Sequence, residues 1–232
     1  MMTAKIRWIG WLCALLMMMS AGTAMAQKND PCAGCHKDWS KVLPKDHAAV
    51  SGGFGQCRTC HKTGTDGTAT ENGFSTRLHK AHAAGEHKLA CETCHSFVDG
   101  KSFGLLGEEA NLGVVKKEDL ALMQQKMATW ADGPYTDHLH AKGNVDCAGC
   151  HGKPVPVSDT TVENPRCLEC HGPVEKLAER SANKEFPKRN PHASHYGSEI
   201  ACTSCHKAHE ASVVMCADCH KLWKLNIPGA AQ

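Results

Sequence analysis

Cys147-Ala-Gly-Cys150-His151 is one of seven stretches in which two cysteines enclose two residues and a histidine follows directly. The chain has 15 cysteines, and all of them except Cys13 belong to this C-x-x-C-H pattern. Since one pattern accounts for nearly every cysteine, it governs what the chain can bind and how it can fold. The other copies begin at Cys32, Cys57, Cys91, Cys167, Cys202 and Cys216.

The pattern is typical of covalent attachment of c-type haem. The two thiols form thioethers at the porphyrin edge, and the adjacent histidine binds the iron from one face. Zinc sites and disulfide frameworks also use paired cysteines, but neither needs a histidine directly after each second cysteine. We therefore expect seven haems c. They would be attached through Cys32, Cys35, Cys57, Cys60, Cys91, Cys94, Cys147, Cys150, Cys167, Cys170, Cys202, Cys205, Cys216 and Cys219, with His36, His61, His95, His151, His171, His206 and His220 as proximal ligands.

The remaining histidines can supply the second axial ligand of each iron. The chain has 16 histidines, so nine lie outside the motifs, whereas seven bis-histidine haems need seven more. A His/Met haem at one site is the alternative, with Met123, Met127 or Met215 as ligand. The nine histidines are His47, His79, His82, His87, His138, His140, His192, His195 and His209.

Two pairs of histidines share an H-x-x-H spacing, His79-Lys-Ala-His82 and His192-Ala-Ser-His195. On a helix, residues three apart lie on the same face. Each pair can therefore ligate two different irons and hold two haems close together.

The first 26 residues have the order of a secretory signal peptide. Lys5 and Arg7 precede an apolar run from Trp8 to Met19, and small residues end at Ala24-Met25-Ala26. This run is shorter than the roughly 20 apolar residues that span a bilayer. We therefore expect cleavage of residues 1–26, a periplasmic product and no stable membrane insertion.

The composition argues against a nucleic-acid partner and predicts a thin side-chain core. Lys plus Arg is 26 and Asp plus Glu is 24, and loss of Lys5 and Arg7 makes the counts equal. Nucleic-acid binding would need a basic surface. Aromatic residues make up 5% of the chain, which has 21 glycines. We expect the haems themselves to fill the interior.

The motifs fall into two groups, three in residues 27–96 and four in residues 137–232. Each group has its H-x-x-H shortly before its third motif, which suggests one module present twice, without the fourth haem in the first copy. The expected fold is mostly α with extensive loops, two haem modules and little or no β-structure.

Residues 97–136 carry no motif and are expected to link the two modules. Their first part, 97–114, reads as a Gly-rich loop, and 116–130 reads as an amphipathic helix that Asp132-Gly-Pro ends. We expect its apolar stripe to pack on a haem module, and a docking face for a partner or for a second copy of the chain is the alternative. The stripe consists of Leu120, Met123, Met127 and Trp130.

Several stretches of the second group carry a family resemblance: Leu139-His140, Cys167-Leu-Glu-Cys170-His171-Gly172, Pro191-His192-Ala-Ser-His195-Tyr196 and 201–210. They resemble the tetrahaem cytochrome module of the periplasmic flavocytochrome c fumarate reductases and the small, class III cytochrome-like tetrahaem cytochromes. The resemblance extends over about residues 135–223. It implies four bis-histidine haems with His140, His192, His195 and His209 as distal ligands, and it leaves His138 spare.

The first group resembles this family less closely. His79 and His82 align with His192 and His195, but no histidine precedes Cys32. The third distal ligand is therefore His47 or His87, and we favour His47.

The leading prediction for the function is electron transfer without enzymatic activity, either as a free carrier or as the cytochrome subunit of a two-chain reductase. Bis-histidine ligation favours the low potentials of anaerobic respiration. The resemblance implies redox partner proteins, such as a separate periplasmic flavoprotein reductase and a membrane quinol-oxidising cytochrome. The alternatives are a multihaem oxidoreductase with an open iron, although no C-x-x-C-K motif occurs, and a subunit of an extracellular conductive filament.

Overall fold

The structure is a computed structural model that describes residues 32–50, 53–61, 74–107, 109, 111–152, 155, 158–196 and 199–230. The expected signal peptide, residues 1–26, lies outside the described residues.

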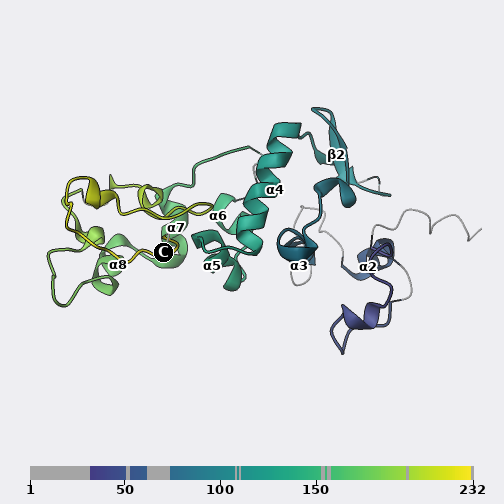
Figure 1. Ribbon diagram of the computed structural model, residues 1–232, viewed down its shortest axis with the longest axis horizontal. Coiled ribbons are helices and arrows are strands. Elements are labelled where there is room, and N and C mark those ends of the chain that lie inside the picture. Colours follow the sequence, from purple (N-terminus) through teal and green to yellow (C-terminus); the bar gives the residue numbers. More distant parts are fainter. Residues whose placement is uncertain are drawn as a thin grey trace, which may run out of the picture.

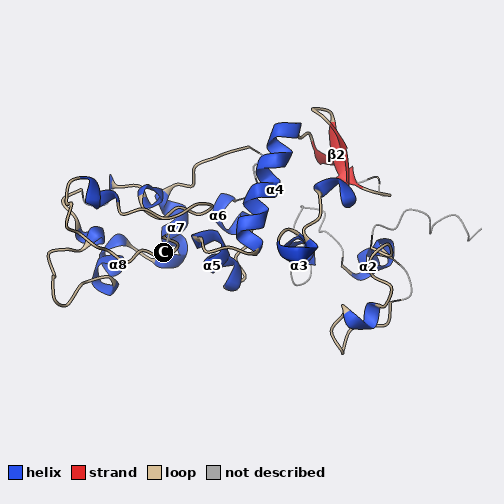
Figure 2. Ribbon diagram, viewed as in Figure 1, coloured by secondary structure: helices blue, strands red, loops and turns tan. Residues whose placement is uncertain are grey.

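Helices and short 3-10 turns dominate the described chain, as Figure 2 shows, so the prediction of a mostly α fold is confirmed. The first group of motifs lies on η1 (Trp39–Lys41), α2 (Phe54–Cys60), α3 (Phe74–His82), η2 (Gly85–His87) and η3 (Cys91–Thr93) and in the turns between them. The second group lies on α5 (Thr136–Lys142), α6 (Cys147–His151), α7 (Asn164–His171), α8 (Val174–Arg180), η4 (Pro191–Ala193), η6 (Cys202–Ser204) and η7 (Met215–Asp218).

Two of the motif helices have clear start and stop signals. Asp146 caps α6, since its Oδ1 accepts a hydrogen bond from the Gly149 backbone N–H at 3.0 Å. Helices α6 and α7 both end at a glycine with φ of 76°, Gly152 and Gly172. This left-handed conformation suits glycine because it lacks a Cβ. The glycine after the motif histidine therefore turns the chain away once that histidine is placed.

A small antiparallel sheet occupies part of the segment that was expected to be a loop. Its strands are β1 (His95–Val98), β2 (Ser102–Leu105) and β3 (Asn111–Gly113), in the order β1-β2-β3. The prediction of a loop over 97–114 was therefore wrong. Asp99-Gly100 is a hairpin signal between two short apolar runs, and Gly100 adopts φ of 61° at the turn. The high glycine content of the segment obscured this signal.

Helix α4 (Lys117–Ala131) confirms the predicted helix over 116–130, and Asp132 caps its C-terminal end. Its apolar stripe contributes to two small clusters rather than to one. Leu120 packs with Phe103 and Val115, while Trp130 packs with Ala131 and Ala141. The stripe is thus part of the interior of the described chain.

Helix α4 joins the two groups of motifs, and Figure 1 shows it between α3 and α5. It packs against both of these helices. Gln124 Nε2 donates to the Leu89 carbonyl at 3.3 Å, and Lys80 Nζ of α3 donates to the Ala141 carbonyl of α5 at 3.1 Å. The segment between the groups is therefore a packed structural element.

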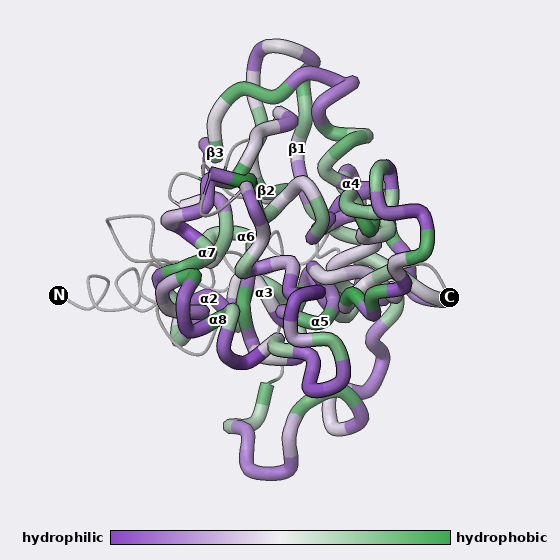
Figure 3. Tube along the Cα trace, turned by 90° about the vertical axis from the view of Figure 1, so that its left-hand side faces the viewer, coloured by the Kyte–Doolittle hydropathy of each residue, from purple (hydrophilic) through white to green (hydrophobic). Residues whose placement is uncertain are grey.

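The side-chain core of the described residues is small. Its buried apolar side chains belong to Phe103, Val115, Leu120, Trp130, Ala131 and Ala141. Figure 3 shows hydrophobic and hydrophilic residues interspersed along the coloured part of the trace. No helix in the described ranges is long and apolar enough to cross a membrane.

Candidate functional site

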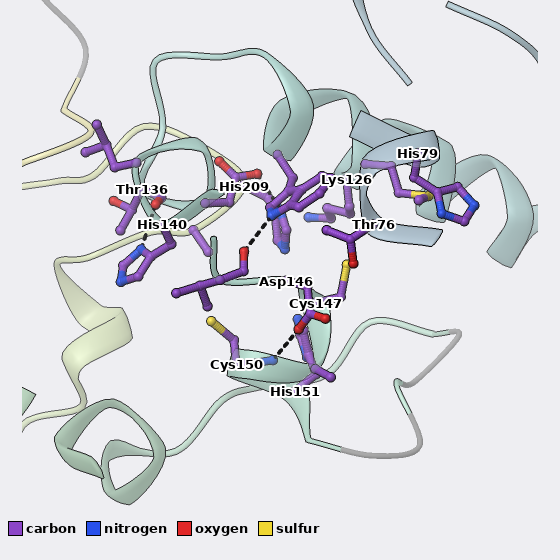
Figure 4. A pocket seen from close by; sticks show the side chains of 18 of the residues that line it. Thr76, His79, Lys126, Thr136, His140, Asp146, Cys147, Cys150, His151 and His209 are labelled. Carbon is purple, nitrogen blue, oxygen red and sulfur yellow. Dashed lines mark hydrogen bonds and ion pairs between the residues drawn. The ribbon is translucent and has the colours of Figure 1, made fainter. Parts of the chain in front are cut away.

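A continuous cavity of about 2590 Å³ takes the place of a conventional core, and residues from both groups line it. Small-molecule sites usually measure about 300–1,000 Å³, so this cavity has room for several large cofactors. Every motif cysteine except Cys60 and Cys219 lines it. Figure 4 shows one part of this cavity, which Cys147, Cys150 and His151 of the second group and His79 of the first all line. The cavity is thus shared between the two groups of motifs.

Within this fold, each of the seven motif histidines faces one histidine from outside the motifs. In every pair the ring centroids lie 5.9–6.3 Å apart. Two imidazoles that bind one metal from opposite sides have centres about 6 Å apart, because a His–metal bond is about 2 Å long. The donor set therefore fits a metal between the two rings of each pair. The pairs are His36–His82, His61–His47, His95–His79, His151–His209, His171–His140, His206–His192 and His220–His195.

The seven non-motif histidines in these pairs are the ones predicted as distal ligands, and His47 rather than His87 faces His61. In the described part of the chain, neither His87 nor His138 faces a motif histidine. His138 Nδ1 instead donates to the Trp130 carbonyl at 3.1 Å. The binding of iron by the paired histidines stays a prediction.

The two H-x-x-H pairs differ from expectation in one respect. His79 and His82 lie on α3 as predicted, but His192 lies on the 3-10 turn η4, and Ser194 beyond it is extended. A single helical face therefore does not explain the second pair. In both H-x-x-H pairs the two histidines nevertheless face different motifs. His192 faces His206 and His195 faces His220, while His79 faces His95 and His82 faces His36.

The two groups also differ in which motif the second histidine of H-x-x-H faces. His195 faces His220 of the fourth motif, whereas His82 faces His36 of the first motif in its own group. A simple copy without its fourth motif would leave His82 without a partner. The fold instead brings the Cys32 motif back beside α3, so the two groups pair the second histidine of H-x-x-H differently.

Hydrogen bonds at Nδ1 set the direction in which the distal rings point. His79, His82 and His140 each contact the carbonyl four residues earlier on their own helix, at 2.9, 2.8 and 2.8 Å. A carbonyl can only accept, so Nδ1 carries the proton and Nε2 is left as the free donor atom for a metal. The helix backbone thereby fixes both the tautomer and the ring orientation.

Other histidine rings are oriented by Nδ1 hydrogen bonds to residues that lie farther away in the sequence. His95 Nδ1 donates to the Gly104 carbonyl of β2 at 2.9 Å. His192 Nδ1 contacts Ser181 Oγ at 2.8 Å, and His209 Nδ1 contacts Asp137 Oδ2 at 2.8 Å. Ser181 and Asp137 were not predicted as supporting residues, because no local pattern in the sequence links them to histidines 11 and 72 positions away.

Burial keeps several of these rings in the form that can bind a metal. It lowers the pKa of His79, His95 and His206, with neighbouring histidines lowering the pKa of His79 and His206 further. A lower pKa favours the neutral imidazole, whose Nε2 lone pair is available. The rings are thus prepared for ligation at neutral pH.

The geometry distinguishes haem from zinc. Zinc in a structural site needs about four protein ligands that converge on one point. In the described residues, no three side chains of His, Cys, Asp or Glu converge in this way. Burial also raises the pKa of Cys91, Cys147 and Cys150, which disfavours the thiolate that zinc requires. Two opposed imidazoles beside a cysteine pair instead fit a porphyrin that supplies the equatorial ligands.

Comparisons with known proteins agree with this geometry. Residues 139–221 match the cytochrome c3 family. Two proteins named fumarate reductase (cytochrome), both from Shewanella frigidimarina, are 43% and 42% identical over 64 residues, which is 27% of this chain but 11% and 10% of theirs. A high-molecular-weight cytochrome c from Nitratidesulfovibrio vulgaris is 28% identical over 158 residues, 62% of this chain and 22% of that protein.

This chain therefore spans only a small part of the length of these relatives. The C-x-x-C-H motifs, the opposed histidine rings and the family match point to the same cofactor chemistry. Residues 139–221 match the cytochrome c3 family, and these findings together support a multihaem c-type cytochrome.

Proposed function

We propose that this protein is a periplasmic cytochrome with seven covalently attached haems c that passes electrons between redox partners. The observation that carries the proposal is that every motif histidine faces a second imidazole at the spacing of a bis-histidine metal site. The haems supply reversible one-electron chemistry at iron. The paired histidines would hold the iron, and the motif cysteines that line the shared cavity would hold the porphyrin edge.

The proposed distal ligands are His47, His79, His82, His140, His192, His195 and His209. If these histidines bind iron in pairs, each iron would have two protein ligands and no position open to a substrate, and this favours an electron carrier over an enzyme. A His/Met site is disfavoured because each motif histidine already faces an imidazole ring. The described histidine pairs thus support transfer of electrons without substrate chemistry.

The proposed partners are a separate periplasmic flavoprotein reductase and a membrane quinol-oxidising cytochrome. Two of the relatives are named fumarate reductase (cytochrome), and the matched segment is about a tenth of their length. A similar electron-transfer segment in this chain is suited to serve a reductase carried on another polypeptide. Anaerobic respiration is the setting that low-potential bis-histidine haems fit.

The haem count and spin state test this proposal. Intact mass and haem staining of the denatured protein should give seven haems on the polypeptide that begins at Gln27. Six or fewer in fully matured protein would contradict the count. Electron paramagnetic resonance of the ferric protein should show low-spin iron throughout, and a strong high-spin signal or carbon monoxide binding after reduction would favour the enzyme alternative.

The angles between the paired rings give the electron paramagnetic resonance experiment a more specific expected result. The rings are nearly perpendicular in His36–His82 and His140–His171, at 77° and 82°, and nearly parallel in four other pairs, at 2–19°. Parallel rings donate into the same iron d orbital and split the d levels, whereas perpendicular rings leave two levels nearly degenerate. We therefore expect rhombic low-spin signals together with a second class of large-g signals, and a single class would contradict the pairing.

A further inference from the structure

One proposed haem ligand, His209, differs from the others in what its outer nitrogen contacts. His209 Nδ1 lies 2.8 Å from Asp137 Oδ2, and a carboxylate can only accept, so the imidazole donates. His79, His82 and His140 donate to backbone carbonyls, and His192 meets the Ser181 hydroxyl. Within the described part of the chain, no other histidine contacts a carboxylate in this way.

Asp137 is buried and firmly held. Its side chain is 4% exposed, and Asp137 is the one acidic residue among the buried residues of the described chain. Oδ1 accepts from the His138 backbone N–H at 2.7 Å, while Oδ2 accepts from Thr129 Oγ1 at 2.5 Å. The Asp137 backbone N–H donates to the Ala208 carbonyl at 3.0 Å, which brings His209 to the start of α5. A buried carboxylate costs free energy unless it is hydrogen-bonded, and the donors around Asp137 supply these hydrogen bonds.

Figure 4 shows where His209 lies relative to the motif that it serves: with His151, it flanks the region next to Cys147 and Cys150. The ring planes of His151 and His209 are 12° apart, with centroids 6.3 Å apart. The carboxylate therefore acts on the distal side of the site at the Cys147 motif, near the junction with the first group.

We infer that Asp137 is a positioning residue that fixes His209 and lowers the reduction potential of the haem attached at Cys147 and Cys150. The inference rests on the proposed bis-histidine ligation. A carboxylate that accepts from the outer nitrogen makes the imidazole a stronger donor and stabilises the oxidised metal. Second-shell hydrogen bonding is one of the ways in which a protein sets a haem potential. Thr129 limits the effect, because its hydroxyl donates to the same carboxylate oxygen.

Asp137→Asn tests the inference with little change of shape. The single amide oxygen can still accept from His209, but the negative charge is lost and the amide NH2 then faces the His138 backbone N–H, which had donated to Oδ1. A redox titration followed by nuclear magnetic resonance should show one set of haem methyl signals moving to a higher potential. That set should show cross-relaxation with the His209 ring, and the other six haems should keep their potentials. No shift, in protein that remains low-spin, would overturn the inference and leave the ligand proposal intact.

Two further variants separate this effect from general charge and packing effects. Asp146→Asn removes a carboxylate that lies next to the same motif and caps α6. Among the described residues, this carboxylate forms no hydrogen bond or ion pair with a histidine. The potential of the haem at Cys147 should shift less in Asp146→Asn than in Asp137→Asn. Equal shifts in the two variants would attribute the effect to loss of charge alone and would overturn the inference. Thr129→Val removes the competing donor, so the potential should stay or fall. A rise as large as that of Asp137→Asn would indicate loosened packing and would also overturn it. High-spin iron in the unmodified protein would instead overturn the ligand proposal itself.

Discussion

At the scale of single residues, a histidine outside the motifs is proposed as a ligand only where its ring faces the ring of a motif histidine. His192 and His138 have similar local surroundings, since the Nδ1 atom of each ring takes part in a hydrogen bond. His192 faces His206 at 6.1 Å, whereas His138 faces no motif histidine in the described chain. A histidine pattern in the sequence cannot separate these two cases by itself.

Alanine substitutions at these two positions should therefore give different spectra. His192→Ala should leave the iron at His206 without its sixth ligand, so one haem should become high-spin in the ferric protein. His138→Ala should keep all haems low-spin and cost about 1 kcal/mol, the typical value of one hydrogen bond. Electron paramagnetic resonance and denaturant unfolding measure the two effects. High-spin iron in His138→Ala would show that the spare histidine had been assigned wrongly.

At the scale of elements, α4 contributes most of the side-chain packing between the two groups of motifs. Leu120 is 5% exposed and packs on Phe103 and Val115, which connects the helix to the small sheet. Trp130 Nε1 donates to the Val145 carbonyl at 3.1 Å, which connects its other end to the chain before α6. The helix therefore packs between the two groups of motifs.

Leu120→Ala should destabilise the protein by about 2–3 kcal/mol, because it removes buried methyl groups and leaves a cavity. Leu222→Ala is the matched control, since Leu222 is 88% exposed and its loss should cost less than about 0.5 kcal/mol. Chemical unfolding of the haem-loaded protein, followed by absorbance, compares the two. Equal effects would mean that the haems, rather than the α4 contacts, account for all of the stability at this position.

At the scale of the whole molecule, the net charge determines how partners approach. The polypeptide after the predicted signal has equal numbers of acidic and basic side chains. Each haem adds a pair of propionate groups, and only part of their charge is offset by the ferric iron. Ligating histidines are neutral and add no compensating charge. The loaded protein should therefore be acidic, although the sequence as a whole carries a formal charge of +2.

An acidic cytochrome should bind a partner with a basic docking surface, and the association rate should fall as salt rises. Opposite charges steer the encounter, and salt screens them beyond about 8 Å at physiological ionic strength. Stopped-flow oxidation of the reduced cytochrome by its flavoprotein partner, across a salt series, measures this. A rate independent of salt would argue for an apolar contact. Because α4 packs inside the described chain, that contact would have to lie elsewhere than on its stripe.

The sequence alone predicted c-type haem and the mostly helical class, because covalent haem attachment demands one local pattern that can be recognised without any fold. The individual attachment cysteines and the count of seven haems stay predictions. The sequence also predicted α4, whose apolar residues recur at helical spacing. It missed the hairpin of β1 and β2, where a single Asp-Gly turn was hidden among other glycines. Cofactor attachment and helix formation can be predicted in this way because both depend on residues that are close together in the sequence.

The tertiary structure alone decided which histidine faces which motif. His36 and His82 are far apart in the chain, as are His151 and His209, and both pairs meet only because the chain folds back on itself. The same holds for Asp137, which reaches His209 across 72 positions. The two axial ligands of one metal lie on opposite sides of a macrocycle, so no sequence spacing between them is required, and only the fold specifies the pairs.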